Sequence, residues 1–209
     1  MTEPFLITGL PRSRTAWLAA AAMNDHSICY HEPLQYFDRW EDVFTRIWGI
    51  RPDNDVRYIG VSDHALGFHL AAIMRRAAPR TLIVERPIAD VKVSLARCGL
   101  QGTNFCALLQ EALAFKHPNI LRVSFAALES SDVVARCLAH LMPSAVISRA
   151  RIEALQPLNI QANVGLTLQT AVHRAGDAAA LLGADVVARL RANSASFGRP
   201  NSASRGRHA

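Results

Sequence analysis

Residues 4–23 read PFLITGLPRSRTAWLAAAAM and contain three successive pieces of local structure. The apolar run at residues 4–8 is typical of a buried strand, and the alanine-rich run at residues 16–23 is typical of a helix. The stretch GLPRSRT, residues 9–15, joins them. A strand, a tight loop and a helix N-terminus direct backbone N–H groups and the positive end of a helix dipole at one point. The stretch therefore predicts an anion-binding loop in an α/β protein.

The rest of the chain alternates short apolar runs with helical patterns, which is typical of βαβ units and a parallel sheet. We therefore expect a three-layer αβα fold with a doubly wound parallel sheet. The expected strands lie at about 4–9, 27–31, 57–62, 80–85 and 119–124. The expected helices lie at about 34–48, 66–77, 88–97, 104–115, 131–141, 148–155 and 170–192. The helix at 34–48 has one apolar and aromatic face, which predicts packing on the sheet or, alternatively, a wall of a substrate pocket.

Length and composition favour one compact domain. The chain has 209 residues, of which 50% are hydrophobic and 19% charged. We expect residues 1–193 to form the domain and residues 194–209, rich in Ser, Gly and Arg, to form a disordered basic tail. No apolar run approaches the roughly 20 residues that span a bilayer, and no basic region precedes an apolar stretch at the N-terminus. These features predict a cytoplasmic protein without a membrane span.

The basic residues are unevenly divided between the two types. The net charge is +6, yet Lys92 and Lys116 are the only lysines. A basic balance fits an anionic ligand, and it also fits nonspecific affinity for nucleic acid. Because the loop has no lysine, a cationic catalyst there must be Arg12 or Arg14. The four cysteines have no metal-ligand spacing, which predicts free thiols.

The loop side chains suit an oxyanion. Ser13 and Thr15 supply hydroxyl donors, while Arg12 and Arg14 supply guanidinium groups that grip oxyanions in bidentate fashion. The alternative is an ordinary turn between strand and helix with solvated arginines. The loop lacks the lysine of the G-x-x-x-x-G-K-[ST] motif found in nucleotide kinases and GTPases.

The run PRSRTAWL, residues 11–18, resembles the P-[KR]-S-G-T-T-x-L loop of P-loop sulfotransferases. It differs at Arg14, where the family usually has Gly, and at Ala16, where it usually has Thr. The resemblance implies a P-loop NTPase-like fold that binds 3′-phosphoadenosine 5′-phosphosulfate (PAPS) and releases the product PAP. The residues it implies for the cofactor loop are Pro11, Arg12, Ser13, Arg14, Thr15 and Ala16.

A second segment, LIVERPIADVKVSL at residues 82–95, is similar to the strand-R-x-P-x-D-x-x-x-S segment of the same family. There an arginine at the strand end and a serine eight residues later bind the 3′-phosphate, and Arg86 and Ser94 have that spacing. Alternatively, Arg86 pairs with Asp90 at a helix start. A weaker match, ILRVSFAAL at residues 120–128, is similar to the strand that leads to V-x-Y-E-D-L.

Polar residues that follow two of the expected strands are candidates for a general base. Glu32 follows the second strand, as the catalytic Glu does in some bacterial members of the family, and His31 is its rival because imidazole titrates nearer neutrality. His64 follows the third strand, where many members have a lysine. The alternatives are a strand-end turn, a hydrogen-bonded histidine, and a helix cap by Ser62 or Asp63.

The resemblance implies transfer of a sulfuryl group from PAPS to a hydroxyl or amine. Arg12 would stabilise the transferring group, and the chemistry requires no metal. Carbohydrate, lipid, phenol and peptide acceptors all remain open at this stage. The alternatives are a P-loop phosphotransferase that uses ATP and a non-catalytic module that binds a nucleotide or nucleic acid.

Overall fold

The computed structural model describes residues 2–24, 26–49, 56–100 and 103–156. The expected helix at 170–192 and the expected tail at 194–209 lie outside these ranges, as does the domain boundary at residue 193. The described strands agree with the predicted ones to within one residue at each end. They are β1 (Glu3–Gly9), β2 (Ser27–His31), β3 (Tyr58–Ser62), β4 (Arg80–Glu85) and β5 (Ile120–Ser124).

Helices alternate with these strands along the described ranges. The α-helices are α1 (Thr15–Ala21), α2 (Asp42–Arg46), α3 (Leu70–Arg76), α4 (Ile88–Ala96), α5 (Thr103–Leu113), α6 (Ser131–Leu141) and α7 (Arg149–Leu155). The short 3-10 helices are η1 (Pro33–Tyr36), η2 (Ala65–His69) and η3 (Ala126–Glu129). No helix in this part of the chain has the length and apolar character needed to cross a bilayer.

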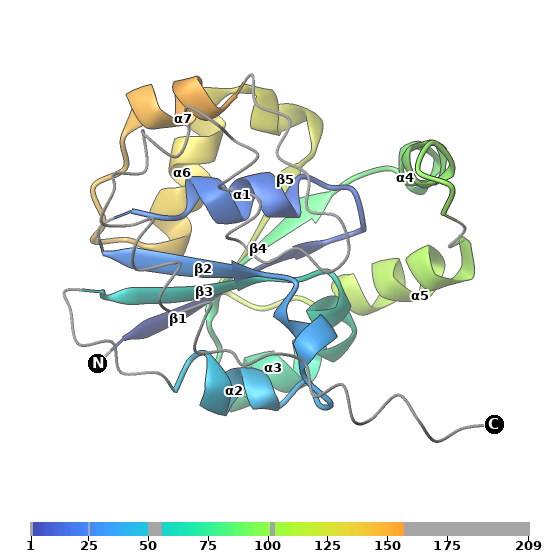
Figure 1. Cartoon of the computed structure of the whole chain (residues 1–209), viewed down its shortest axis with the longest axis horizontal. Coiled ribbons are helices and arrows are strands. Elements are labelled where there is room, and N and C mark those ends of the chain that lie inside the picture. The colour runs from blue at the N-terminus through green and yellow to red at the C-terminus, as the bar shows by residue number, and fades with distance from the viewer. Residues whose placement is uncertain (1, 25, 50–55, 101–102, 157–209) are drawn as a thin grey trace.

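The five strands form one sheet in the order β2-β3-β1-β4-β5, and every neighbouring pair is parallel. The prediction of an α/β fold with a parallel sheet is thereby confirmed. Helices α1, α6 and α7 lie on one side of the sheet and α2 and α3 on the other, which is compatible with a three-layer αβα fold (Figure 1). Helices α4 and α5 lie beyond the carboxyl ends of the strands (Figure 1).

Strand β1 is the point where the direction of winding changes. The chain leaves β1 to form β2 and β3 on one side, then crosses to form β4 and β5 on the other. In open α/β sheets ligands bind outside the carboxyl ends of the strands at such a switch point. The fold therefore places the loop after Gly9 at the favoured ligand position.

The sheet packs tightly at its centre. Phe5, Leu6 and Ile7 of β1 are completely buried. Gly60 of β3 accommodates the Phe5 ring, since a Cβ atom at this glycine would lie 2.0 Å from the ring. A Cβ atom at Gly9 would lie 2.6 Å from the Val84 carbonyl oxygen, so β1 and β4 approach closely just before the loop.

The prediction of one helix at residues 34–48 is wrong. The segment forms η1, then an extended residue at Phe37, then the short helix α2. Contacts elsewhere in the fold override the helical periodicity: Leu34 N–H donates to the Asp63 carboxylate at 3.1 Å, and Trp40 stacks on His69 at 5.0 Å between ring centroids. The expected helix at 66–77 also begins differently, as the 3-10 helix η2 that continues into α3.

Candidate functional site

The loop between β1 and α1 has an unusual backbone. Arg12 and Arg14 have φ angles of 64° and 60°, in the left-handed region that favours glycine. A non-glycine residue there costs about 1–2 kcal/mol of conformational free energy. Backbone strain of this kind clusters at ligand-binding sites. Arg14, one of the two left-handed residues, stands where the resembled sulfotransferase loop usually has Gly.

The second predicted motif meets this loop in space. Arg86, at the end of β4, donates a hydrogen bond from Nη1 to the carbonyl oxygen of Arg12, 74 residues earlier in the chain. Arg12 in turn donates from Nε to the Ser94 hydroxyl on α4, at 3.3 Å. The structure therefore brings together the arginine of the loop and the predicted arginine and serine pair. Burial lowers the pKa of Arg86, and the charge of its alternative partner, Asp90, only partly opposes this.

Positive charge is concentrated around this junction. Burial lowers the pKa of Arg86, and the charges of Arg12 and Arg14 lower it further. The guanidinium carbons of Arg86 and Arg14 lie 4.2 and 5.4 Å from the centroid of the Phe125 ring. Arg14 also forms an ion pair with Glu129 at 2.7 Å. Repulsion among the three cations favours binding of a polyanion, which would relieve it.

Three polar atoms of the loop and of the adjoining end of β4 are buried without a hydrogen-bond partner, namely Ser13 Oγ, Arg14 Nη1 and Arg86 Nε. Unsatisfied buried donors cost about 1–3 kcal/mol each, and they fit the oxygens of a phosphate or sulfuryl group. Ser13 is fully buried, so an oxygen of a ligand can reach its hydroxyl only if the surrounding structure moves.

The remaining predicted loop residues have different environments. Pro11 is half-buried, whereas Thr15 and Ala16 are buried in the first turn of α1. The carbonyl oxygen of Thr15 accepts a hydrogen bond from the Ser62 hydroxyl at 2.8 Å, which fixes the start of α1 to the end of β3. The loop is thus connected to the neighbouring strand as well as to β4.

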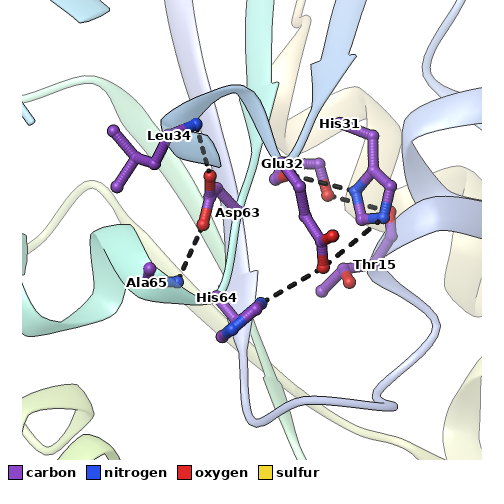
Figure 2. A network of polar contacts seen from close by, with 8 residues as sticks. Thr15, His31, Glu32, Leu34, Asp63, His64 and Ala65 are labelled. Atoms are coloured by element: carbon purple, nitrogen blue, oxygen red, sulfur yellow. Dashed lines mark hydrogen bonds and ion pairs between the residues drawn. The ribbon is translucent and has the colours of Figure 1, made fainter. Parts of the chain in front are cut away.

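The candidates for a general base converge at the ends of β2 and β3 (Figure 2). Strands β2 and β3 pair in parallel with His31 opposite Ser62, so the residues that follow each strand are neighbours. Glu32 Oε1 lies 3.2 Å from His64 Nδ1 and 3.8 Å from His31 Nε2. The three residues that were proposed as rivals therefore form one cluster, with the Glu32 carboxylate between the two imidazoles.

The contacts within the cluster lower the pKa of Glu32 and raise the pKa of His64. Burial alone would raise the pKa of Glu32, but the hydrogen bond from His64 and the charges of His31, His64 and Arg12 together lower it. Burial alone would lower the pKa of His64, but the hydrogen bond to Glu32 and the charges of Asp63 and Glu32 together raise it. The Glu32 carboxylate is thus a weakened base, and the His64 imidazole is a strengthened one.

His31 has a structural environment. Its side chain is buried, and its Nδ1 lies 3.0 Å from the carbonyl oxygen of Ser62. Because a carbonyl oxygen only accepts, Nδ1 carries the proton of this bond. Burial lowers the pKa of His31. These contacts match the alternative of a hydrogen-bonded histidine and tie the end of β2 to β3.

Asp63 has a positioning role that goes beyond the helix cap considered from the sequence. Its buried carboxylate accepts hydrogen bonds from the backbone N–H of Ala65 at 2.8 Å and from that of Leu34 at 3.1 Å (Figure 2). It thereby joins the start of η2, next to His64, to the turn that carries Glu32. The helix cap considered for Asp63 is present as its bond to Ala65, the first residue of η2, although the N-cap position itself is His64. A carboxylate directly after a buried strand was the available signal.

A cavity of about 470 Å³ lies elsewhere in the molecule. It is bounded by the end of α1, by Asn24 and His26 before β2, and by α6 and α7. None of the described residues that line it is a predicted site residue. The chemistry-bearing side chains gather instead at the carboxyl ends of β1 to β4.

The predicted residues thus fall into two adjoining groups in the described structure. The arginine cluster consists of Arg12, Arg14 and Arg86 with Ser94, and the strand-end cluster consists of Glu32, His31 and His64. The charge of Arg12 acts on Glu32, which links the two groups. Comparison of the chain with known proteins finds no matching family model, no similar curated protein and no similar solved structure.

Proposed function

We propose that the chain is a P-loop sulfotransferase that moves a sulfuryl group from PAPS to a hydroxyl or amine acceptor. The observation that carries the proposal is the junction between the two sequence motifs. Arg86 bonds to the loop at Arg12, and Arg12 bonds to Ser94, although 74 and 82 residues separate these pairs in the chain. Two motifs that belong to one cofactor site are expected to meet in this way.

The arginine cluster supplies the cofactor chemistry in this proposal. Arg86 and Ser94 would hold the 3′-phosphate, and Ser13 with the backbone of the loop would hold the 5′-phosphosulfate. Arg12 would stabilise negative charge on the sulfuryl and leaving phosphate oxygens, where a preorganised cation is most effective. The buried donors Ser13 Oγ and Arg86 Nε support this fit, because both lack a partner within the protein.

The strand-end cluster supplies the base. We assign proton abstraction to His64 and its orientation to Glu32. The Glu32 carboxylate accepts the Nδ1 proton of His64 at 3.2 Å, which leaves Nε2 as the proton acceptor of the neutral ring. The raised pKa of His64 and the lowered pKa of Glu32 both support His64 as the base and Glu32 as the residue that orients it. The sequence alone had favoured Glu32 as the base.

Titration calorimetry of the full chain with PAP, AMP and ATP with magnesium tests the proposal. Only PAP carries a 3′-phosphate, and one charged hydrogen bond to it contributes about 1.5–3 kcal/mol. PAP is therefore expected to bind at least about tenfold more tightly than AMP. Equal affinities for PAP and AMP would refute the proposal, and a clear preference for ATP with magnesium would favour the phosphotransferase alternative.

A further inference from the structure

Most of the exposed large apolar side chains of the described residues come from one stretch of the chain, and two of them adjoin the strand-end cluster. Six large apolar side chains are exposed among the described residues: Phe68, Val93, Leu100, Phe105, Leu108 and Val146. Five of the six lie between residues 68 and 108, on η2, α4, the turn after α4 and α5. Single exposed apolar residues are normal, but Phe68 and Phe105 contact each other beside the reactive His64, and such an exposed pair marks a binding surface.

This surface reaches the proposed base through two aromatic rings. The Phe105 ring lies edge-to-face with the His64 imidazole, at 5.7 Å between centroids and 74° between planes. The Phe68 ring lies edge-to-face with Phe105, at 5.0 Å and 71°. Both phenylalanine side chains are more than one-third exposed. A row of rings therefore runs from His64 to solvent along η2 and α5.

We infer that the acceptor is an aromatic alcohol, a phenol, whose ring packs on Phe105 and Phe68 while its hydroxyl faces Nε2 of His64. This inference rests on the proposed sulfotransferase function. Aromatic rings favour the edge-to-face and offset geometries that this row of rings offers. A polyhydroxylated sugar needs polar partners for its several hydroxyl groups, and the two phenyl rings supply none.

The chemistry of the step agrees with this acceptor. The phenol oxygen forms a bond to sulfur, the bond between sulfur and the bridging phosphate oxygen breaks, and PAP leaves with that electron pair. The phenol proton passes to Nε2 of His64, whose Nδ1 proton is held by Glu32 at 3.2 Å. A phenol hydroxyl has a pKa of about 10, so an imidazole removes its proton far more readily than that of an aliphatic alcohol.

The test compares three matched alcohols: 4-methylphenol, 4-methylcyclohexanol and methyl glucoside. Each is titrated calorimetrically into the full chain, with and without saturating PAP. We expect 4-methylphenol to bind most tightly and the glucoside not to bind measurably. Phe105→Leu keeps an apolar side chain but removes the ring. It is therefore expected to weaken the binding of 4-methylphenol about fivefold and to leave the binding of 4-methylcyclohexanol unchanged.

Val146→Ala is the matched control, since Val146 is 89% exposed and belongs to neither proposed group. This variant is expected to bind 4-methylphenol as the wild type does. The inference is overturned if the glucoside binds as tightly as 4-methylphenol, or if Phe105→Leu leaves 4-methylphenol binding unchanged. If PAP binds and no phenol does, the acceptor inference alone fails. If 4-methylphenol binding depends on Phe105 but PAP does not bind, the sulfotransferase proposal fails and the aromatic-alcohol site stands.

Discussion

Replacement of Arg86 by alanine tests the proposed cofactor site at the point where the end of β4 meets the loop after β1. Arg86 donates a hydrogen bond from Nη1 to the Arg12 carbonyl oxygen, and its buried Nε has no hydrogen-bond partner within the protein. If the guanidinium also binds the 3′-phosphate, the substitution removes at least one charged hydrogen bond, which contributes about 1.5–3 kcal/mol. The dissociation constant for PAP is then expected to rise about ten- to a hundredfold.

Arg80→Ala is the matched control for the change in net charge. Arg80 begins the same strand, is exposed, and its side-chain bond goes to the His140 carbonyl at 3.4 Å. The two arginines are six positions apart along extended chain, a distance of about 20 Å. Because this distance is more than twice the Debye length of about 8 Å at physiological ionic strength, Arg80→Ala is expected to change PAP affinity less than about twofold.

Calorimetric titration of both variants with PAP and AMP separates the 3′-phosphate contact from an effect on the loop. Loss of the hydrogen bond to the Arg12 carbonyl is expected to weaken the binding of AMP as well, but by a smaller factor than the binding of PAP. The reasoning is refuted if Arg86→Ala weakens PAP and AMP by the same factor. It is also refuted if Arg80→Ala weakens PAP as much as Arg86→Ala does.

Three further substitutions test other parts of the account. Glu32→Gln removes the negative charge that raises the pKa of His64 and leaves only a weaker, neutral acceptor for its Nδ1 proton, so the acidic limb of the kcat profile is expected to move to lower pH while kcat falls. An NMR titration of the imidazole measures the shift, and an unchanged pKa of His64 would exclude the pairing. Arg12→Ala is expected to slow sulfuryl transfer at least about a hundredfold in steady-state assays, with a smaller loss of PAP affinity, whereas equal losses would argue against a role in the transition state. Gly60→Ala places a Cβ atom 2.0 Å from the Phe5 ring and is expected to lower the free energy of unfolding by about 1–3 kcal/mol in urea denaturation; an unchanged midpoint would contradict the described packing.

Local patterns in the sequence were sufficient to predict the strands. Each strand is a short apolar run bounded by polar or turn residues, and buried parallel strands require this composition. The segment at 34–48 could not be predicted in the same way. Its helical spacing is real, but Leu34 is held by Asp63 and Trp40 by His69, and both partners are distant in the chain. Contacts of that kind leave no local signal.

The composition of the site was predictable, but its geometry was not. The loop arginines and the strand-end polar residues stand out in the sequence because of their positions after apolar runs. That Glu32 contacts His64 depends on β2 lying next to β3, with His31 opposite Ser62. That Arg86 contacts Arg12 depends on β4 lying next to β1. Strand order and register are properties of the whole sheet, so a motif alone cannot supply them.

A crystal structure of the full chain with bound PAP tests the central claim most directly. The account predicts that the 3′-phosphate lies within hydrogen-bonding distance of the Arg86 guanidinium and the Ser94 hydroxyl. It also predicts that the 5′-phosphate lies against residues 12–15, with Arg12 displaced from its present bond to Ser94. PAP bound in the cavity between α1, α6 and α7, or bound with its 3′-phosphate away from Arg86, would contradict it.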